Sequence, residues 1–464
     1  MQDLFLGIDL GTTAIKFAVI GADNYVYQTS VAVTTFNGPN GARYQSAAEI
    51  LRLITETLLQ IPSELRTKIN KVAFSTAMHS LWPVDPDNST NDQIFIWSDQ
   101  QAAGVVADFK QTELAKSFYL KTGTPIHPMS PFAKIKYFKS QAVKQYPAQT
   151  KWLGLKELLL DFFTGKIVLD YSTASATGLL NLSELDWDAE ILQHLGIGEE
   201  NLAQLVDCRT PLAIKETVAT AFGLDPKTQV YPGASDGCLA AYAGFVNSGN
   251  RDSLTIGTSA AVRRINEEIK LDPIKQNFCY YLGPINYVVG APSNNGGIVF
   301  EWAKKMSHSN NFYNELVQVL NDTSVGANGV KFWPFLNGER APYWDATKRA
   351  EFKYISTETT KSEMLRAIVE GMLLNVRSLA ELVGVSKTVT ASGGFFKTQE
   401  LAQLTADILG VDLAISDSNE PLAGLYSLIT GGKVLNNKND APVHISFNSN
   451  NNQQYNKLYP HYFE

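Results

Sequence analysis

Two short turns combine glycine with hydroxyl or acidic side chains, a pattern suited to holding a phosphate. The first is Asp9-Leu-Gly11-Thr12-Thr13, and the second is Gly257-Thr258-Ser259. Glycine lets backbone N–H groups approach a phosphate closely, and a nearby carboxylate can hold Mg²⁺. An ordinary glycine hairpin is the alternative for the first turn. The recurrence of the same design in the second half of the chain favours the phosphate interpretation.

An acidic residue, Asp236, stands between the two turns. It follows an apolar strand that begins at Val230 and precedes a helix of small residues at 238–245. A carboxylate at such a junction can cap the helix N-terminus, which is the structural alternative. The functional interpretation is a carboxylate that faces a cleft.

Further polar candidates follow the ends of predicted strands. His79 comes after the apolar run 71–75, and Asp99 comes after the run 93–97. Open α/β sheets place their ligands at such strand ends, so both side chains are candidate substrate contacts. His127 lies in a run with three prolines, 122–131, that can present it rigidly. A histidine satisfied within the core or a turn is the alternative for His79.

The elements that must position these residues show clear periodicity. Leu4, Leu6 and Ile8 alternate before the first turn, and Ile15, Phe17 and Val19 alternate after it, which predicts a half-buried hairpin. A second hairpin is expected at 253–263. Thr360 and Glu363 predict a capping box that opens a long helix. The Asn/Gln-rich segment 448–456 is expected to be a solvated loop.

Length and composition bound the class of protein. A chain of 464 residues predicts two domains, which we place at 1–247 and 248–464, with a polar hinge at 247–252. The net charge of −7 argues against nucleic acid as a partner. Cys208, Cys238 and Cys279 form no CxxC pair, so buried core cysteines in a reducing compartment are expected. The start of the chain has no signal-peptide pattern and no run spans a membrane, which favours the cytoplasm.

Taken in order, these motifs resemble the FGGY carbohydrate kinases. Asp9 to Lys16 is similar to the first phosphate loop of that family, and Gly257-Thr258 to the second. Met78-His79 and Trp97-x-Asp99 resemble the sugar site, and Asp236-Gly237 resembles the catalytic acid with its neighbour. Gly393-Gly394, with Thr398, Gln403 and Asp407, resembles the adenosine loop and helix. The resemblance implies an α/β fold of two ribonuclease-H-like domains around a central cleft.

Several longer phrases are closest to the gluconate kinase branch of the family. They are 77–80, 123–131, 233–237 and 293–297. Two departures stand out: Gln101 replaces an arginine that many relatives carry, and Leu425-Tyr426-Ser427 replaces a Gly-Ala-Ala segment. We expect the first to affect sugar preference and the second to affect nucleotide fit.

The resemblance also implies a chemistry, in which ATP and Mg²⁺ phosphorylate a primary hydroxyl, with D-gluconate as the expected substrate. Asp236 is the expected base, and Asp9 is expected to hold Mg²⁺ through water. The implied substrate contacts are Met78, His79, Trp97, Asp99, His127 and Asp236. The implied ATP contacts are Gly11, Thr12, Thr13, Lys16, Gly257, Thr258, Gly297, Gly393, Gly394 and Thr398. The alternatives are a xylulose or other polyol or ketose kinase, and a non-kinase module that binds ATP. A homodimer is expected by analogy alone.

Overall fold

The computed structural model describes residues 3–85, 91–141, 146–283, 286–309, 311–416, 420–435 and 442–464. Within these residues, none of the helices is long and apolar enough to cross a membrane.

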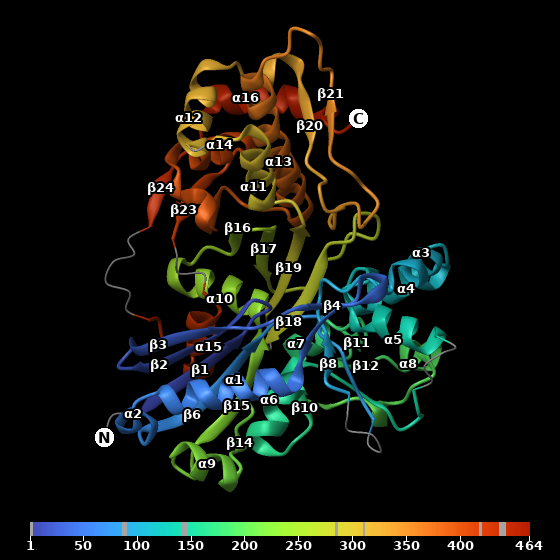
Figure 1. Ribbon diagram of the computed structural model, residues 1–464, viewed down its shortest axis with the longest axis vertical. Coiled ribbons are helices and arrows are strands. Elements are labelled where there is room, and N and C mark those ends of the chain that lie inside the picture. Colours follow the sequence, from blue (N-terminus) through green and yellow to red (C-terminus); the bar gives the residue numbers. More distant parts are fainter. Residues whose placement is uncertain are drawn as a thin grey trace.

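The first half of the chain is built on a sheet in the order β14-β15-β6-β1-β2-β3 (Figure 1). β1, β2 and β3 form an antiparallel meander, whereas β6 and β15 run parallel to β1. The strands are β1 (Leu4–Leu10), β2 (Ala14–Gly21), β3 (Asn24–Ala32), β6 (Ile69–Thr76), β14 (Leu212–Ala213) and β15 (Gln229–Ser235). The helices of this half that pack on or beside the sheet are α1 (Ala47–Gln60), α2 (Ser63–Arg66), α6 (Leu155–Thr164), α9 (Glu216–Phe222) and α10 (Asp236–Ser248).

The sheet of the second half repeats this plan. Its order is β18-β19-β17-β16-β22-β23-β24, with an antiparallel meander β16-β17-β19 and with β22 and β23 parallel to β16. The strands are β16 (Asp252–Ile256), β17 (Ala260–Asn266), β18 (Phe278–Gly283), β19 (Asn286–Ser293), β22 (Thr388–Ser392), β23 (Asp412–Ile415) and β24 (Val443–Ile445). The other elements of this half are β20 (Lys331–Trp333), β21 (Glu351–Lys353), α11 (Gly297–Ser307), α12 (Phe312–Asp322), α13 (Lys361–Val383), α14 (Gln399–Leu409), α15 (Pro421–Thr430) and α16 (Ser449–Leu458). The two predicted hairpins therefore occupy equivalent positions in two related sheets.

A smaller lobe is inserted in the first half and packs around its own aromatic core. Its strands are β4 (Phe36–Asn37), β5 (Arg43–Ser46), β7 (Trp82–Val84), β8 (Gln93–Phe95), β9 (Lys151–Leu153), β10 (Val168–Asp170), β11 (Leu180–Asn181), β12 (Asp186–Trp187) and β13 (Gln204–Val206). Its helices are α3 (Ala103–Phe109), α4 (Glu113–Thr122), α5 (Pro131–Ser140), α7 (Tyr171–Ser175) and α8 (Ala189–Leu195). Cys279 and Tyr281 of β18 complete the same core, so this lobe also contacts the second half.

The first hairpin is buried on both faces rather than half-buried as expected. Leu6 and Ile8 of β1 pack with α1 and α6, whereas Phe5 packs on the opposite face with α10 and α15. Gly7 makes room for α15, because a Cβ there would lie 2.9 Å from Leu422 Cδ2. The alternate positions Phe5 and Gly7 thus face a second helix layer.

Helix α15 joins the two halves. It follows the second sheet in sequence but packs on β1, β6, β15 and α10 of the first half (Figure 1). The close contact with α10 depends on Gly424, since a Cβ there would lie 2.0 Å from Leu239 O. The division at 247 and 248 stays a prediction, and this helix crosses it.

Other expectations can be compared directly with the structure. The capping box of Thr360 and Glu363 is confirmed at the start of α13, and all three cysteines are buried and free. The solvated loop expected at 448–456 is wrong, because Ser449–Leu458 is α16. Asp407 explains the difference: its carboxylate accepts from the backbone N of Asn448 (2.7 Å) and from Asn451 Nδ2 (2.8 Å). Tertiary hydrogen bonds therefore stabilise a segment whose composition disfavours a helix.

Candidate active site

A cavity of about 400 Å³ lies between the two halves of the molecule. Its lining combines the first turn (Thr12), the second turn (Ser259), Asp236, and the predicted sugar contacts Met78, His79 and Trp97. The motifs chosen from sequence thus converge on one space, although Thr12 and Ser259 are about 250 residues apart in the chain. The charged groups of the lining are one carboxylate, Asp236, and two guanidinium groups, Arg263 and Arg340.

Asp236 is the first residue of α10 and projects into this cavity. Its Oδ1 accepts a hydrogen bond from Gly237 N at 2.7 Å. Burial raises the pKa of the Asp236 carboxyl, while the Gly237 N–H and the charge of Arg263 act in the opposite direction. The strand before Asp236, β15, has a bulge between Tyr231 and Ala234. The carboxylate has one backbone donor and free acceptor capacity toward the cavity, as a general base requires.

Asp9 is buried near the C-terminal end of β1, where the charge of Asp236 acts on its carboxyl. Ser75 Oγ donates to Asp9 Oδ1 at 2.6 Å. The pKa of Asp9 is raised to about 7, mainly by burial and in smaller part by the charge of Asp236, while the Ser75 hydrogen bond acts in the opposite direction. A cation would relieve the cost of two neighbouring buried carboxylates. In the described part of the chain there is no group of three or more His, Cys, Asp or Glu arranged to hold a metal.

The first turn is held by backbone and side-chain contacts. Gly11 N donates to Ala14 O at 3.1 Å, and Gln45 Nε2 donates to Thr12 O at 2.9 Å. Thr13 O accepts from Val33 N. Lys16 is partly exposed and forms an ion pair with Glu420, which precedes α15, at 3.5 Å. The side chain of Lys16 therefore links the two halves at the edge of the turn.

The second turn is packed against two other predicted glycines. Gly297 N donates to Gly257 O at 2.6 Å, and a Cβ on Gly297 would lie 2.7 Å from that oxygen. A Cβ on Gly393 would lie 2.2 Å from Ile256 O, and its φ is +110°. Ile298 N donates to Thr258 O at 3.1 Å. Gly257, Gly297 and Gly393 thus form one compact backbone cluster, in which the close approach requires glycine at 297 and 393.

The remaining predicted adenosine residues divide into two groups. Gly394 has open space around its Cα, and Thr398 precedes α14. Asp407, in contrast, is buried and occupied by Asn448, Asn451 and Gln403 Nε2. Its contacts in the structure are those of a support for α16.

His79 lines the cavity in a constrained conformation. Its φ is +68°, its Nδ1 lies 2.7 Å from Ala176 O, and its Nε2 lies 3.4 Å from Tyr280 Oη. Burial lowers the pKa of the imidazole to about 3, so the ring is neutral at physiological pH. A neutral ring must donate from Nδ1 to the carbonyl, which leaves Nε2 as an acceptor. Nε2 can therefore accept from a substrate hydroxyl only in place of Tyr280 Oη, and the ring supplies no positive charge.

Asp99 and His127, both predicted substrate contacts, lie behind the lining residues. Asp99 accepts from Arg43 N at 2.9 Å and from Gln101 N at 3.3 Å. His127 Nδ1 accepts from Met129 N at 3.2 Å, and its ring packs edge-on against Trp344. Neither side chain is among those that line the cavity. Both support the loops that carry Trp97 and Met129.

Arg263 and Arg340 are the charged lining residues that sequence reasoning missed. Nε of each guanidinium is buried and has no hydrogen-bond partner among the described residues. Arg263 Nε lies near Gly237, and Arg340 Cζ lies 5.2 Å from the ring centroid of Trp97. Arg263 follows the second turn in β17 and Arg340 lies in the rigid 338–342 turn, but no local pattern distinguishes them from other basic residues.

The two sequence departures lie away from the cavity. Leu425 is fully buried against the first sheet, and Tyr426 packs edge-on against Phe5 and donates to Asp23 Oδ1 at 2.5 Å. Gln101 is not among the lining residues either. Leu425 and Tyr426 do not line the cavity, so their expected effect on nucleotide fit stays a prediction.

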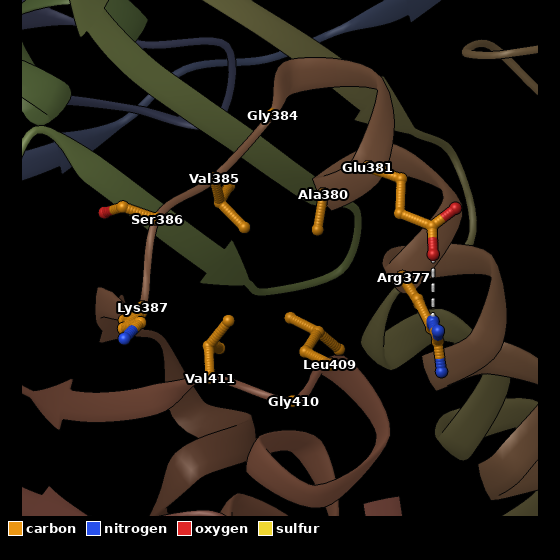
Figure 2. Close-up of a pocket in the computed structure, with 10 residues that line it drawn as sticks. All are labelled: Arg377, Ala380, Glu381, Gly384, Val385, Ser386, Lys387, Leu409, Gly410 and Val411. Carbon is orange, nitrogen blue, oxygen red and sulfur yellow. Dashed lines mark hydrogen bonds and ion pairs between the residues drawn. The ribbon is translucent and has the colours of Figure 1, made fainter. Parts of the chain in front are cut away.

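A second pocket, of about 320 Å³, opens at the C-terminal end of α13 (Figure 2). Two of its lining residues form an ion pair with each other: Arg377 Nε donates to Glu381 Oε1 at 3.1 Å. Lys387 and Ser386 lie on the opposite side of the opening. The Arg377 guanidinium is already paired, in contrast to Arg263 and Arg340.

The comparisons with known proteins agree with this geometry. Residues 4–243 match the N-terminal domain, and residues 253–424 the C-terminal domain, of the FGGY family of carbohydrate kinases. A gluconokinase of Bacillus subtilis is 31% identical over 92% of this chain and 88% of its own length. A xylulose kinase of Staphylococcus xylosus is 23% identical over 88% of this chain and 86% of its own.

Solved structures include two similar kinases of Lactobacillus acidophilus. Its gluconate kinase superposes with a TM-score of 0.92 at 30% identity, and covers 100% of this chain and 97% of that one. Its ligand-bound xylulose kinase gives the same TM-score and identity, over 99% and 97%.

The two related sheets and the cavity between them define a two-domain α/β protein with ribonuclease-H-like halves, as expected. The chain belongs to the FGGY family of carbohydrate kinases.

Proposed function

We propose that this carbohydrate kinase is an ATP-dependent gluconate kinase that phosphorylates the primary hydroxyl of D-gluconate to give 6-phosphogluconate. The observation that carries the choice of substrate is the charge of the cavity. Its lining holds two guanidinium groups and one carboxylate, in a chain of net charge −7. A buried excess of positive charge favours an anionic ligand, because an unpaired buried cation is costly. Gluconate is an anion, whereas xylulose is neutral.

In this proposal Asp236 accepts the proton of the attacking hydroxyl. The carboxylate is ionised with the help of the Gly237 N–H and the nearby Arg263, which oppose the effect of burial. His79 orients the substrate as a neutral hydrogen-bond acceptor at Nε2. Met78 and Trp97 close the apolar sides of the site. Proton acceptance and orientation of this kind account for part of the catalysis in phosphoryl transfer.

The residues present fit ATP and Mg²⁺. Backbone N–H groups of the turns at 11–13 and 257–258 would hold the phosphates, with the glycine cluster of Gly257, Gly297 and Gly393 keeping the second turn close. Asp9 would hold Mg²⁺ through water, since a cation would stabilise the ionised carboxylate that burial disfavours. When bound, Mg²⁺ neutralises charge on the transferred phosphoryl group.

The proposal is tested with a panel of sugars and sugar acids, read as ADP release in the presence of ATP and Mg²⁺. We expect D-gluconate to give the highest kcat/KM of the panel. A wild-type protein that prefers xylulose or another neutral substrate would contradict the proposal.

The role of Asp236 is tested by Asp236→Asn at saturating gluconate. We expect kcat to fall by about a hundredfold or more, because the proton acceptor is lost while the volume is kept. Asp108→Asn, on the exposed face of α3, is the matched control and should retain wild-type turnover. Near wild-type turnover in Asp236→Asn means that another group accepts the proton.

A xylulose kinase is the second candidate. The ligand-bound xylulose kinase of Lactobacillus acidophilus is as similar in structure as the gluconate kinase, at 30% identity. The two candidates differ in the charge of the substrate, and the same panel separates them.

A further inference from the structure

The loop that carries Arg340 is fixed by the buried carboxylate of Glu339. Five donors converge on this carboxylate: Ser293 Oγ (2.6 Å), Asn375 Nδ2 (2.7 Å), Arg340 N (2.7 Å), Asn294 N (2.9 Å) and Asn295 Nδ2 (3.1 Å). Because its acceptor positions are filled, Glu339 holds the backbone of Arg340 and leaves the guanidinium of Arg340 without an acidic partner. The backbone of the loop is thus held in place, while the Arg340 guanidinium forms no ion pair with Glu339.

The guanidinium of Arg340 lies over an aromatic ring of the other half. Its Cζ is 5.2 Å from the ring centroid of Trp97, and Nη2 donates to Ser293 O at 2.9 Å. Nε is buried without a partner among the described residues. Stacking on an aromatic ring and one fixed donor orient the planar group, so that the remaining N–H groups present a fork suited to a carboxylate.

The lysines near the sugar side of the cavity, Lys134 and Lys110, already donate hydrogen bonds to backbone carbonyl groups. Lys134 Nζ donates to His79 O at 2.7 Å and to Met129 O. Lys110 Nζ donates to Trp344 O at 2.6 Å. His79 is neutral. Arg263 lies beside Gly237 and reaches Thr255 Oγ1 at 3.5 Å, and so sits at the Asp236 side of the cavity, close to the second turn.

We propose that Arg340 binds the carboxylate of the substrate and thereby makes the site selective for sugar acids over neutral sugars and polyols. This assignment rests on the proposed function, in which Asp236 activates the primary hydroxyl at the opposite end of the same substrate. Trp97 holds the guanidinium in place as the substrate enters, and Arg263 remains available for charge near the reacting hydroxyl.

The test compares D-gluconate with D-gluconamide, in which a neutral amide replaces the carboxylate, on Arg340→Gln. We expect kcat/KM for gluconate to fall by about 10- to 100-fold, the usual range for loss of a charge-assisted hydrogen bond. The value for gluconamide should change far less. The ratio of the two values is measured in one preparation, so a general loss of folded protein does not alter it.

Two further variants complete the test. Arg340→Lys keeps the charge without the planar fork, and we expect an intermediate ratio. If Arg340→Gln does not fold, the gluconate-to-gluconamide ratio of Arg340→Lys tests the assignment in its place. Arg377→Gln removes a partly buried arginine of the separate pocket in Figure 2, where Glu381 already pairs with it, and should leave the ratio unchanged.

The outcomes separate the two proposals. A wild-type protein that does not phosphorylate gluconate contradicts the proposed function itself. A wild-type protein that takes gluconate, together with Arg340 variants whose gluconate-to-gluconamide ratio is unchanged, overturns only the assignment of Arg340.

Discussion

The buried carboxylate of Asp9 shows how a functional residue can oppose stability. Burial raises its pKa from 3.8 to about 7, and the charge of Asp236 adds to the effect. Between these two pH values the folded chain binds more protons at Asp9 than the unfolded chain does. The free energy of unfolding therefore falls as the pH rises from about 4 to 7, and stays low above that. A site poised for a cation carries this cost whenever the cation is absent.

Asp9→Asn should remove this pH dependence, because the amide does not titrate and can still accept from Ser75 Oγ. Without ligand, we expect the variant to gain about 2 kcal/mol over the wild type between pH 5.5 and pH 8, which is the shift from 5.5 to the folded pKa converted to free energy. The measurement is the denaturant midpoint at several pH values. A difference between the two proteins that does not change with pH would contradict the role of the carboxyl. The same variant should lose stabilisation by ATP and Mg²⁺.

Candidate site residues that follow predicted strands could be chosen from the sequence, whereas the arginines of the cavity could not. Asp236 and His79 were chosen because each follows the end of an apolar strand. Arg340 acquires its role from Glu339, Ser293 and Trp97, which come together only in the folded chain. Asp99 and His127 lie behind the lining of the cavity, where Asp99 and His127 Nδ1 accept from backbone N–H groups, and their role as substrate contacts stays a prediction.

At the scale of elements, the bulge in β15 is what aims Asp236. Lys156 Nζ, fully buried on α6, donates to Pro232 O (2.6 Å), Phe74 O (2.9 Å) and Ala234 O (3.1 Å). It also lies 3.4 Å from Asp170, whose carboxylate caps α7. Three carbonyls of two strands are thus bound to one cation, and α10 begins two residues after the bulge.

Gly233 is the residue that this bulge depends on. Its φ is +68°, and a Cβ would lie 2.0 Å from Phe74 O. We expect Gly233→Ala to destabilise the protein by about 2 to 5 kcal/mol, from left-handed strain and overpacking, and to reduce kcat through displacement of Asp236. Gly104→Ala in α3 is the control: a Cβ there meets no atom within 4 Å, and about 0.5 to 1 kcal/mol of stabilisation is expected. Thermal unfolding and ADP release measure both, and an active Gly233→Ala would refute the role of the bulge.

Local patterns predicted the elements well where burial and capping agree. The capping box of α13 needs only two residues three positions apart, and it was found from sequence. α16 was missed because its polar residues satisfy Asp407 on α14, a contact between segments far apart in the chain. Hydrogen bonds between segments that are far apart in the chain leave no periodic pattern in the sequence of either segment.

At the scale of the whole molecule, α15 makes the first half depend on the second. Leu422, Leu425, Tyr426 and Leu428 fill the core between the first sheet and α10. Burial of side chains of this size contributes about 2 kcal/mol each, so the helix supplies a free energy comparable to the net stability of a domain. Closure of the cavity must therefore move a second half that remains anchored through this helix. The hinge expected at 247–252 stays a prediction; in this segment α10 ends at Ser248, and Asp252 begins β16 and is held by Arg264 and Ser386.

The fragment 1–247 should not fold to a well-packed state by itself. We expect it to bind ANS and to lack a cooperative thermal transition, because the face of the first sheet that α15 covers is exposed. Co-expression with 248–464 should restore a soluble, co-purifying complex, since α15 is then supplied in trans. A 248–464 half with Leu425→Asp is the matched control: a carboxylate on the docking face should prevent association. A cooperative transition in 1–247 alone would show that the sheet is stable without α15, and that the halves are independent domains.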